Sequence, residues 1–171
     1  MFAEHSMPTI SKILVGTDFS DDATLALSHA EELARKFGAE MILLHVDQAL
    51  TPVLISPEPG TGFDPGIFEA SDRIAEERRL IAQRELDRTV NRLRDAGIKA
   101  RCVLRVGAAF VEIVSTAVSE GVDLVVLGTH GRTGLAHILI GSVAERVVRK
   151  CPCPVLTVRA PGRKFKHPAE K

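Results

Sequence analysis

Residues 123–150 read DLVVLGTHGRTGLAHILIGSVAERVVRK, and the order of patterns within them decides the fold. The segment 123–127 predicts a strand, and its residues after Asp123 are apolar on both faces, as in a strand covered by helices on both sides. A glycine-rich segment follows, and residues 142–150 have the pattern of a short helix. A buried strand that leads through such a loop into a helix is typical of a parallel α/β sheet.

The rest of the chain repeats this alternation. Short apolar runs predict further strands at residues 13–17, 41–46, 99–105 and 155–158. Helical spacing predicts a first helix that Ser20 caps and Gly38 ends, followed by helices at 71–96, 108–119 and 142–150. Because parallel strands are joined by right-handed crossovers, we predict an α/β fold, a doubly wound parallel sheet with helices on both faces.

The size of the chain fits one domain. Its 171 residues, 45% of them hydrophobic, are enough to bury a core without disulfides or a structural metal. We assign the domain to residues 11–159, between an extension at 1–10 and a polar tail at 160–171. The proline- and glycine-rich segment 51–68 is expected to form neither strand nor helix, and to be a mobile loop over the mouth of a pocket.

The amino-acid composition argues against two kinds of binding partner, nucleic acids and membranes. The 22 Lys and Arg balance 22 Asp and Glu, and the chain has no Tyr or Trp, so we expect no binding to nucleic acid. Apolar runs are far shorter than the roughly 18 residues of a membrane span, so we expect no membrane association either. The first residues have no signal-peptide pattern, and the chain is therefore predicted to be cytoplasmic.

A candidate binding site follows from the winding of the sheet. In doubly wound sheets, ligands bind at the carboxyl ends of the strands where the winding direction reverses. Gly128 and Gly131 follow the strand at 123–127, and a glycine allows a ligand to approach the backbone. Gly141 precedes the last helix, whose first N–H groups are suited to an anion such as phosphate. These two amide-rich segments predict a phosphate-binding cradle.

The same residues carry a family resemblance. The pattern Gly128-x2-Gly131-x9-Gly141-Ser142 resembles the signature of the nucleotide-binding branch of the universal stress protein family. The opening KILVGTDFS at 12–20 and the close SVAERVVRKCPCPVLTV at 142–158 are similar to the first and last segments of that family. The resemblance covers residues 10–159. It implies a five-stranded sheet of order 3-2-1-4-5, in which the first and fourth strands are neighbours.

The resemblance also implies a site for an adenine nucleotide, ATP with or without Mg²⁺. Asp18 would bond the sugar or base, the backbone of Val46 would hold the adenine edge, and Arg132 would supply a mobile cation. Ala144 stands where relatives often carry Thr or Ser, so a hydroxyl contact to phosphate or metal is absent. The implied binding residues are Gly16, Thr17, Asp18, Val46, Leu127, Gly128, Thr129, His130, Gly131, Arg132, Gly141, Ser142 and Val143.

Several residues have a second interpretation. Asp18 could serve solely as a cap of the first helix, and the glycines could serve solely to form a tight turn. His130 is expected to be a packing or surface residue rather than a general base. Cys151 and Cys153 could be a metal or redox pair, but they lack a second pair of ligands, which favours structural thiols.

Three functions remain open. The first is a stress-response module that binds ATP and acts as a nucleotide-dependent regulator. The second is a slow ATP hydrolase. The sequence argues against it, because it contains neither a Walker sequence nor an obvious carboxylate pair for Mg²⁺ and water. The third is an interaction protein of the same fold that binds no nucleotide. In the implied strand order, residues 155–158 form an open edge, and we predict a homodimer through that strand.

Overall fold

Five parallel strands form the centre of the molecule. The computed structural model describes residues 9–48, 65–131 and 141–159. Their order in the sheet is β3-β2-β1-β4-β5, which confirms the predicted order. The strands are β1 (Lys12–Thr17), β2 (Glu40–Asp47), β3 (Ala100–Val106), β4 (Leu124–Gly128) and β5 (Val155–Val158).

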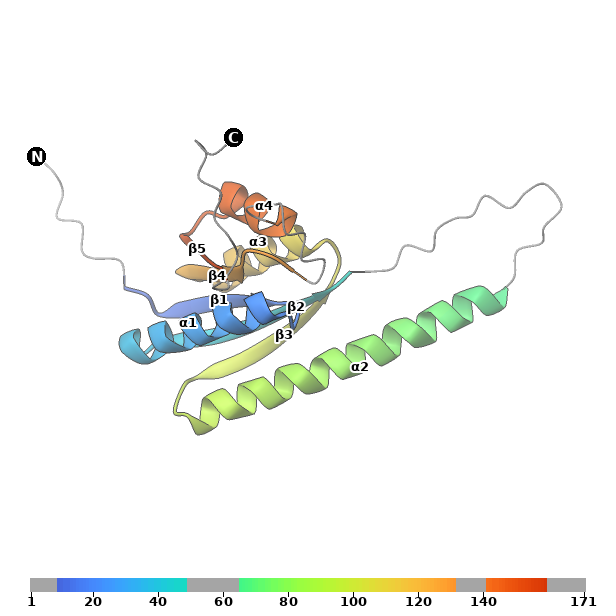
Figure 1. Cartoon of the computed structure of the whole chain (residues 1–171), viewed down its shortest axis with the longest axis horizontal. Helices are drawn as coiled ribbons and strands as arrows, with labels where there is room; N and C mark the ends of the chain where they lie inside the picture. The colour runs from blue at the N-terminus through green and yellow to red at the C-terminus, as the bar shows by residue number, and fades with distance from the viewer. Residues whose placement is uncertain (1–8, 49–64, 132–140, 160–171) are drawn as a thin grey trace, which may run out of the picture.

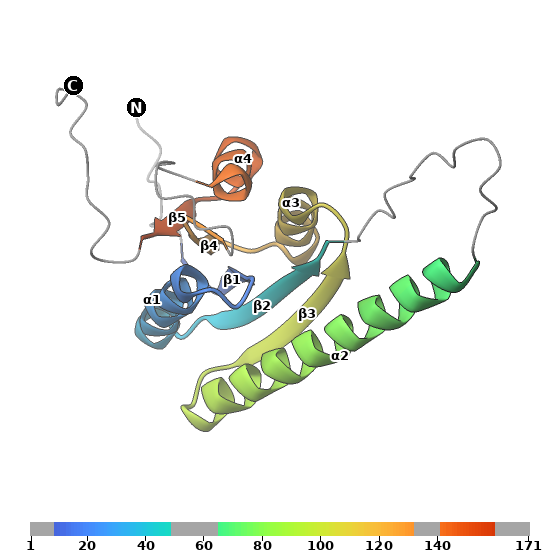
Figure 2. The same ribbon diagram turned by 45° about the vertical axis from the view of Figure 1, so that its right-hand side comes forward.

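The helices cover both faces of this sheet. They are α1 (Asp21–Phe37), α2 (Pro65–Asp95), α3 (Ala109–Glu120) and α4 (Ser142–Lys150). Figures 1 and 2 show α1 and α2 on one face, and α3 and α4 on the other. The doubly wound architecture is therefore confirmed. The chain moves outward from β1 to β3 and then returns to β4 on the other side of β1.

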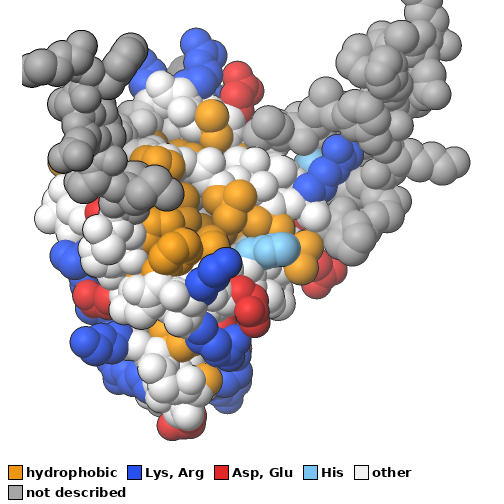
Figure 3. Space-filling view, turned by 90° about the vertical axis from the view of Figure 1, so that its left-hand side faces the viewer, with side chains coloured by type: hydrophobic (Ala, Val, Ile, Leu, Met, Phe, Trp, Pro, Cys, Tyr) orange, Lys and Arg blue, Asp and Glu red, His pale blue; other side chains and the backbone are white. Residues whose placement is uncertain are grey.

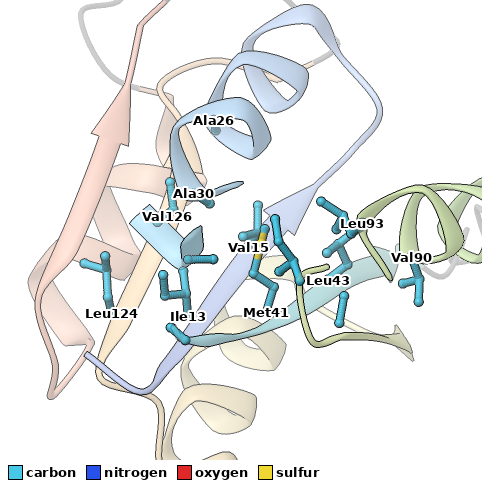
Figure 4. Packing of buried hydrophobic residues seen from close by; sticks show 14 of the residues in the cluster. Ile13, Val15, Ala26, Ala30, Met41, Leu43, Val90, Leu93, Leu124 and Val126 are labelled. Carbon is cyan, nitrogen blue, oxygen red and sulfur yellow. The ribbon is translucent and has the colours of Figure 1, made fainter. Parts of the chain in front are cut away.

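The core is divided by the sheet into two layers, because side chains alternate between the faces of a strand. Figure 4 shows Ile13 and Val15 of β1 directed toward Ala26 and Ala30 of α1. Small alanines on that helix leave room for the large side chains of the strands. The opposite layer packs Leu14, Ile42, Leu44 and Val125 against Ile113, Ala117 and Val147.

The ends of α1 are those expected from the sequence. The Ala23 amide donates to the Ser20 side chain, and Gly38 closes the helix with a φ of 67°. The expected start of the second helix at residue 71 was wrong, because α2 already begins at Pro65. Proline is favourable in a first helical turn, where its missing N–H would have no acceptor. The remainder of the expected loop, residues 51–64, lies outside the described residues.

The surface carries both signs of charge close together. Figure 3 shows Lys and Arg side chains beside Asp and Glu side chains on one side of the molecule. One example is Arg101, which donates to Glu40 and Glu120 at 2.9 and 2.6 Å. Within the described ranges, no helix combines the length and the apolar character needed to cross a membrane.

Asp123 holds the beginning of β1 beside the beginning of β4. Its Oδ2 accepts hydrogen bonds from the backbone amides of Ser11 and Lys12, at 2.8 and 2.9 Å, and from the Ser11 hydroxyl. These backbone bonds lower the pKa of the Asp123 carboxyl, because they favour its charged form. Asp123 lies at the amino end of its strand and therefore far from the switch-point edge.

We expect Asp123→Asn to lower the free energy of unfolding at pH 7. A carboxyl whose pKa is lowered by folding stabilises the protein above its ordinary pKa of about 4, and the benefit is lost as pH falls through the folded pKa. The difference from the unmodified protein should therefore shrink under acid conditions. Urea unfolding at neutral and acid pH measures this, with the exposed Asp72→Asn as control. A difference that grows in acid would contradict the assignment.

Candidate functional site

The carboxyl ends of β1 and β4 meet at the reversal of winding. The two strands pair in parallel, with Val15 opposite Val126. The Gly141 amide donates to the Thr129 carbonyl at 2.6 Å, which joins the start of α4 to the loop after β4. Three segments that are distant in sequence therefore converge at one edge of the sheet.

The first turn of α4 presents backbone donors at this edge. Its N-cap is Gly141, which makes no side-chain capping bond, and the first helical bond runs from the Glu145 amide to the Gly141 carbonyl. The amides of Ser142, Val143 and Ala144 consequently have no acceptor within the helix. Such donors at the positive end of a helix dipole form a site for an anion.

The glycines of the site allow close approach between protein segments. A Cβ on Gly131 would lie 2.7 Å from Asp18 Oδ2, and a Cβ on Gly141 would lie 2.9 Å from the Thr129 carbonyl oxygen. A Cβ on Gly128 would lie 2.8 Å from the backbone of Asp22. The loop after β4 therefore approaches α1 and α4 closely at Gly128 and Gly141, where an added Cβ would meet backbone atoms, whereas at Gly131 it would meet the end of the Asp18 side chain.

The turn after β1 is fixed by its own side chains. The Ser20 amide donates to Asp18 Oδ1 at 3.1 Å, and the Phe19 amide donates to Thr17 Oγ1 at 3.1 Å. Phe19 has a φ of 64°, a left-handed conformation that is uncommon outside glycine. Asp18 thus supports the residue that caps α1 while its other oxygen faces Gly131.

His45 of β2 supports this turn from the side. Its Nδ1 lies 2.8 Å from the Thr17 carbonyl oxygen, and its ring packs on Phe19 with centroids 4.7 Å apart. Neither ring was expected in the site from the sequence. The only indication in the sequence was a polar residue, His45, within the otherwise apolar residues 41–46.

A buried polar cluster holds the loop after β4 against α1. Asp22, Thr129 and His130 are each less than one tenth exposed. The His130 amide and the Thr129 hydroxyl donate to Asp22 Oδ2 at 3.2 and 3.4 Å. His130 is therefore buried against α1, whereas the part played by Asp22 was missed.

The geometry of this cluster differs from a hydrolytic relay. Such a relay uses both ring nitrogens of histidine, one toward the nucleophile and one toward the carboxylate. Here the same atom, His130 Nδ1, lies 2.9 Å from Thr129 Oγ1 and 3.3 Å from Asp22 Oδ2. Through Nδ1 the ring therefore helps to hold the loop after β4 against α1.

We expect Asp22→Ala to lower the free energy of unfolding by about 2 kcal/mol or more, because buried donors lose their acceptor. Urea unfolding at neutral pH measures the change. The matched control is Asp21→Ala, since Asp21 is the exposed neighbour in the same helical turn. That variant should stay within about 1 kcal/mol of the unmodified protein. Equal losses in both variants would show that the cluster does not hold the loop.

The other residues expected in the site reach the same edge. Gly16 pairs with Leu44 and Thr17 with His45, so the following residue of β2, Val46, lies beside the end of β1. A Cβ on Gly16 would lie 2.5 Å from a methyl group of Leu127, so these two positions interlock. Arg132 lies outside the described residues.

Comparison with known proteins assigns the chain to a family. The family model described as the universal stress protein family matches residues 9–159. The chain belongs to this family. A universal stress protein of Methanocaldococcus jannaschii, MJ0577, is 34% identical over 155 residues, which cover 86% of this chain and 94% of that protein.

Solved structures of universal stress proteins agree with this assignment. The MJ0577 structure has a TM-score of 0.78 and 32% identity, covering 91% of this chain and 99% of that chain. A universal stress protein in complex with cAMP has a TM-score of 0.55 and 25% identity, covering 89% and 98%. One from Archaeoglobus fulgidus in complex with dAMP has a TM-score of 0.56 and 25% identity, covering 88% and 99%.

Proposed function

We propose that this universal stress protein binds ATP at the switch point and acts as a cytoplasmic, nucleotide-dependent regulatory module. The observation that carries the proposal is the bond from the Gly141 amide to the Thr129 carbonyl, which places the open first turn of α4 beside the loop after β4. The cAMP and dAMP complexes of related proteins support an adenine nucleotide as the ligand.

The proposed site divides into two halves. Asp18 and the backbone of Val46 would meet the adenosine, with Gly16, Thr17 and Leu127 forming the base of that half. The backbone from Gly128 to Gly131 would follow the ribose and phosphates. The amides of Ser142 and Val143 would donate to phosphate oxygens, and Arg132 would add a positive charge.

A magnesium ion would arrive with the phosphates. Among the described residues, no three His, Cys, Asp or Glu side chains are grouped to hold a metal. Ala144 also provides no hydroxyl in the first turn of α4. We therefore propose that the phosphates supply most of the ligands of any Mg²⁺, consistent with the usual coordination of this ion by substrate phosphates and water.

The proposal is tested by identifying any nucleotide that copurifies with the protein. Protein purified without added nucleotide is denatured, and the released small molecules are separated and identified by mass. Calorimetric titration of emptied protein with ATP, ADP and AMP then ranks affinities. Released or titratable ATP supports the proposal. The absence of binding for all three nucleotides would favour the alternative of an interaction protein that binds no nucleotide.

We further expect ATP hydrolysis to be absent or very slow. In the described part of the chain no three His, Cys, Asp or Glu side chains are grouped to hold a metal, and phosphoryl transfer depends on positioning water and metal. Phosphate release is measured with purified protein, ATP and Mg²⁺. A rate of about 1 s⁻¹ or more, typical of enzymes, that disappears in Asp18→Asn or His130→Asn would instead establish an ATP hydrolase.

A further inference from the structure

Two cysteines lie together between α4 and β5. Cys151 Sγ and Cys153 Sγ are 3.4 Å apart, and both residues are partly exposed. The backbone on either side is fixed, because the Cys151 amide donates to the Val147 carbonyl and the Pro154 carbonyl accepts from the Val125 amide. The proximity of the sulfurs therefore follows from an ordered junction between helix and strand.

We propose that Cys151 and Cys153 form a reversible redox site, which closes to a disulfide by exchange with a small disulfide such as oxidised glutathione. A disulfide bond is about 2.05 Å long, so the sulfurs need to approach by roughly a further 1.4 Å. The third thiol, Cys102, packs with the layer under α1 and α2, whereas this pair packs with the layer under α3 and α4. Exchange within the folded chain is thereby restricted to the pair.

The surroundings of Cys153 favour its protonated form. Burial, and next the contact with Cys151, raises the pKa of the Cys153 thiol to about 12. Both cysteines are partly exposed and either sulfur can donate to the other, so exchange can begin at either thiol.

The exchange balances in two steps. When the Cys151 thiol attacks first and Cys153 is the resolving thiol, Cys151 loses its proton and bonds one sulfur of oxidised glutathione, which expels the first glutathione as a thiolate that takes up a proton. Cys153 then releases its proton to solvent and its sulfur attacks Cys151 Sγ, which expels the second glutathione. The dithiol gives up two electrons and two protons, and oxidised glutathione becomes two thiols.

The position of the pair gives its oxidation a structural consequence. Formation of the disulfide would shift the segment between the last turn of α4 and the first residue of β5. The first turn of α4 borders the loop after β4, and β5 is the last strand of the sheet. Oxidation is therefore expected to change hydrogen exchange of the β5 amides more than that of the β3 amides at the other edge.

Whole-protein mass spectrometry tests the proposal. The folded Cys102→Ser protein is incubated with oxidised glutathione, and we expect it to lose two hydrogen atoms and retain no glutathione. Adding Cys153→Ser should leave one glutathione on Cys151, since the resolving thiol is absent. Dithiothreitol should restore the starting mass in both cases.

Two other results would overturn the proposal. In one, the folded Cys102→Ser protein keeps its original mass at oxidant concentrations that close the disulfide in urea. In the other, it accumulates a stable glutathione adduct although both cysteines are present. Circular dichroism of each variant confirms that folded protein is compared, and peptide mapping locates the bond.

Discussion

Replacing Gly131 by valine is expected to abolish ATP binding in a protein that remains folded. The new Cβ would lie 2.7 Å from Asp18 Oδ2, and valine adds two methyl groups to it. Either the Asp18 carboxylate would have to turn away or the loop after β4 would have to shift, and both changes disturb the contact between the two halves of the proposed site. We expect affinity to fall at least ~100-fold, about 2.7 kcal/mol, as measured by calorimetric titration.

Gly38→Asn provides the control for this experiment. Gly38 closes α1 with a φ of 67°, and no other atom lies within 4 Å of an added Cβ. Asparagine adopts this conformation more readily than most residues, so ATP affinity should be unchanged. Circular dichroism and urea unfolding establish that both variants fold. Unaltered ATP affinity in folded Gly131→Val protein would remove the loop after β4 from the binding site.

The fold was predictable because its signals are local. The runs of β1, β2 and β4 are apolar on both faces, and Ser20 and Gly38 mark the ends of α1 through preferences that act within a few residues. The strand order came from the family resemblance. The start of α2 was misjudged because proline and glycine were weighed as loop residues, although a first helical turn accepts them.

The candidate site was predictable only in part. Its glycines and the open start of α4 are visible in the sequence, because each has an intrinsic backbone property. The bond from His130 to Asp22 joins residues 108 positions apart, and no local pattern indicates it. The ring of Phe19, a residue with a left-handed φ, likewise packs on His45, a contact that forms only when β1 and β2 pair in the folded sheet.

Among the residues that the structure describes, β5 is an edge strand, and some of its backbone groups face away from β4. The Pro154 carbonyl accepts from the Val125 amide of β4, and the Val158 carbonyl accepts from the Thr129 amide directly after β4. Because successive residues of a strand direct their backbone groups to opposite sides, the groups of Leu156 also face β4. Those of Val155 and Thr157 face outward. Leu156, 36% exposed, adds an apolar side chain beside this edge.

We propose that two copies of the chain pair through these outward groups about a two-fold axis, since an open apolar edge favours pairing with another strand. Thr157→Pro should therefore convert dimers to monomers, because proline has no N–H to donate. Because of the two-fold axis, the substitution removes one hydrogen-bond donor from each of the two chains. Together the two losses cost about 2 kcal/mol of association free energy, which weakens the dimer roughly 30-fold. Size-exclusion chromatography with light scattering at micromolar concentrations measures the change.

Thr157→Val is the matched control, because it keeps the backbone donor and a side chain of nearly the same shape. It should remain dimeric. Leu156→Pro is unsuited to the purpose, since it would remove a donor that faces β4 and disturb the sheet itself. If the unmodified protein is monomeric at micromolar concentration, or if Thr157→Pro dimerises as tightly as Thr157→Val, the β5 edge is not the interface. Any dimer would then have to form through another surface, because a β-ladder at this edge depends on the Thr157 amide.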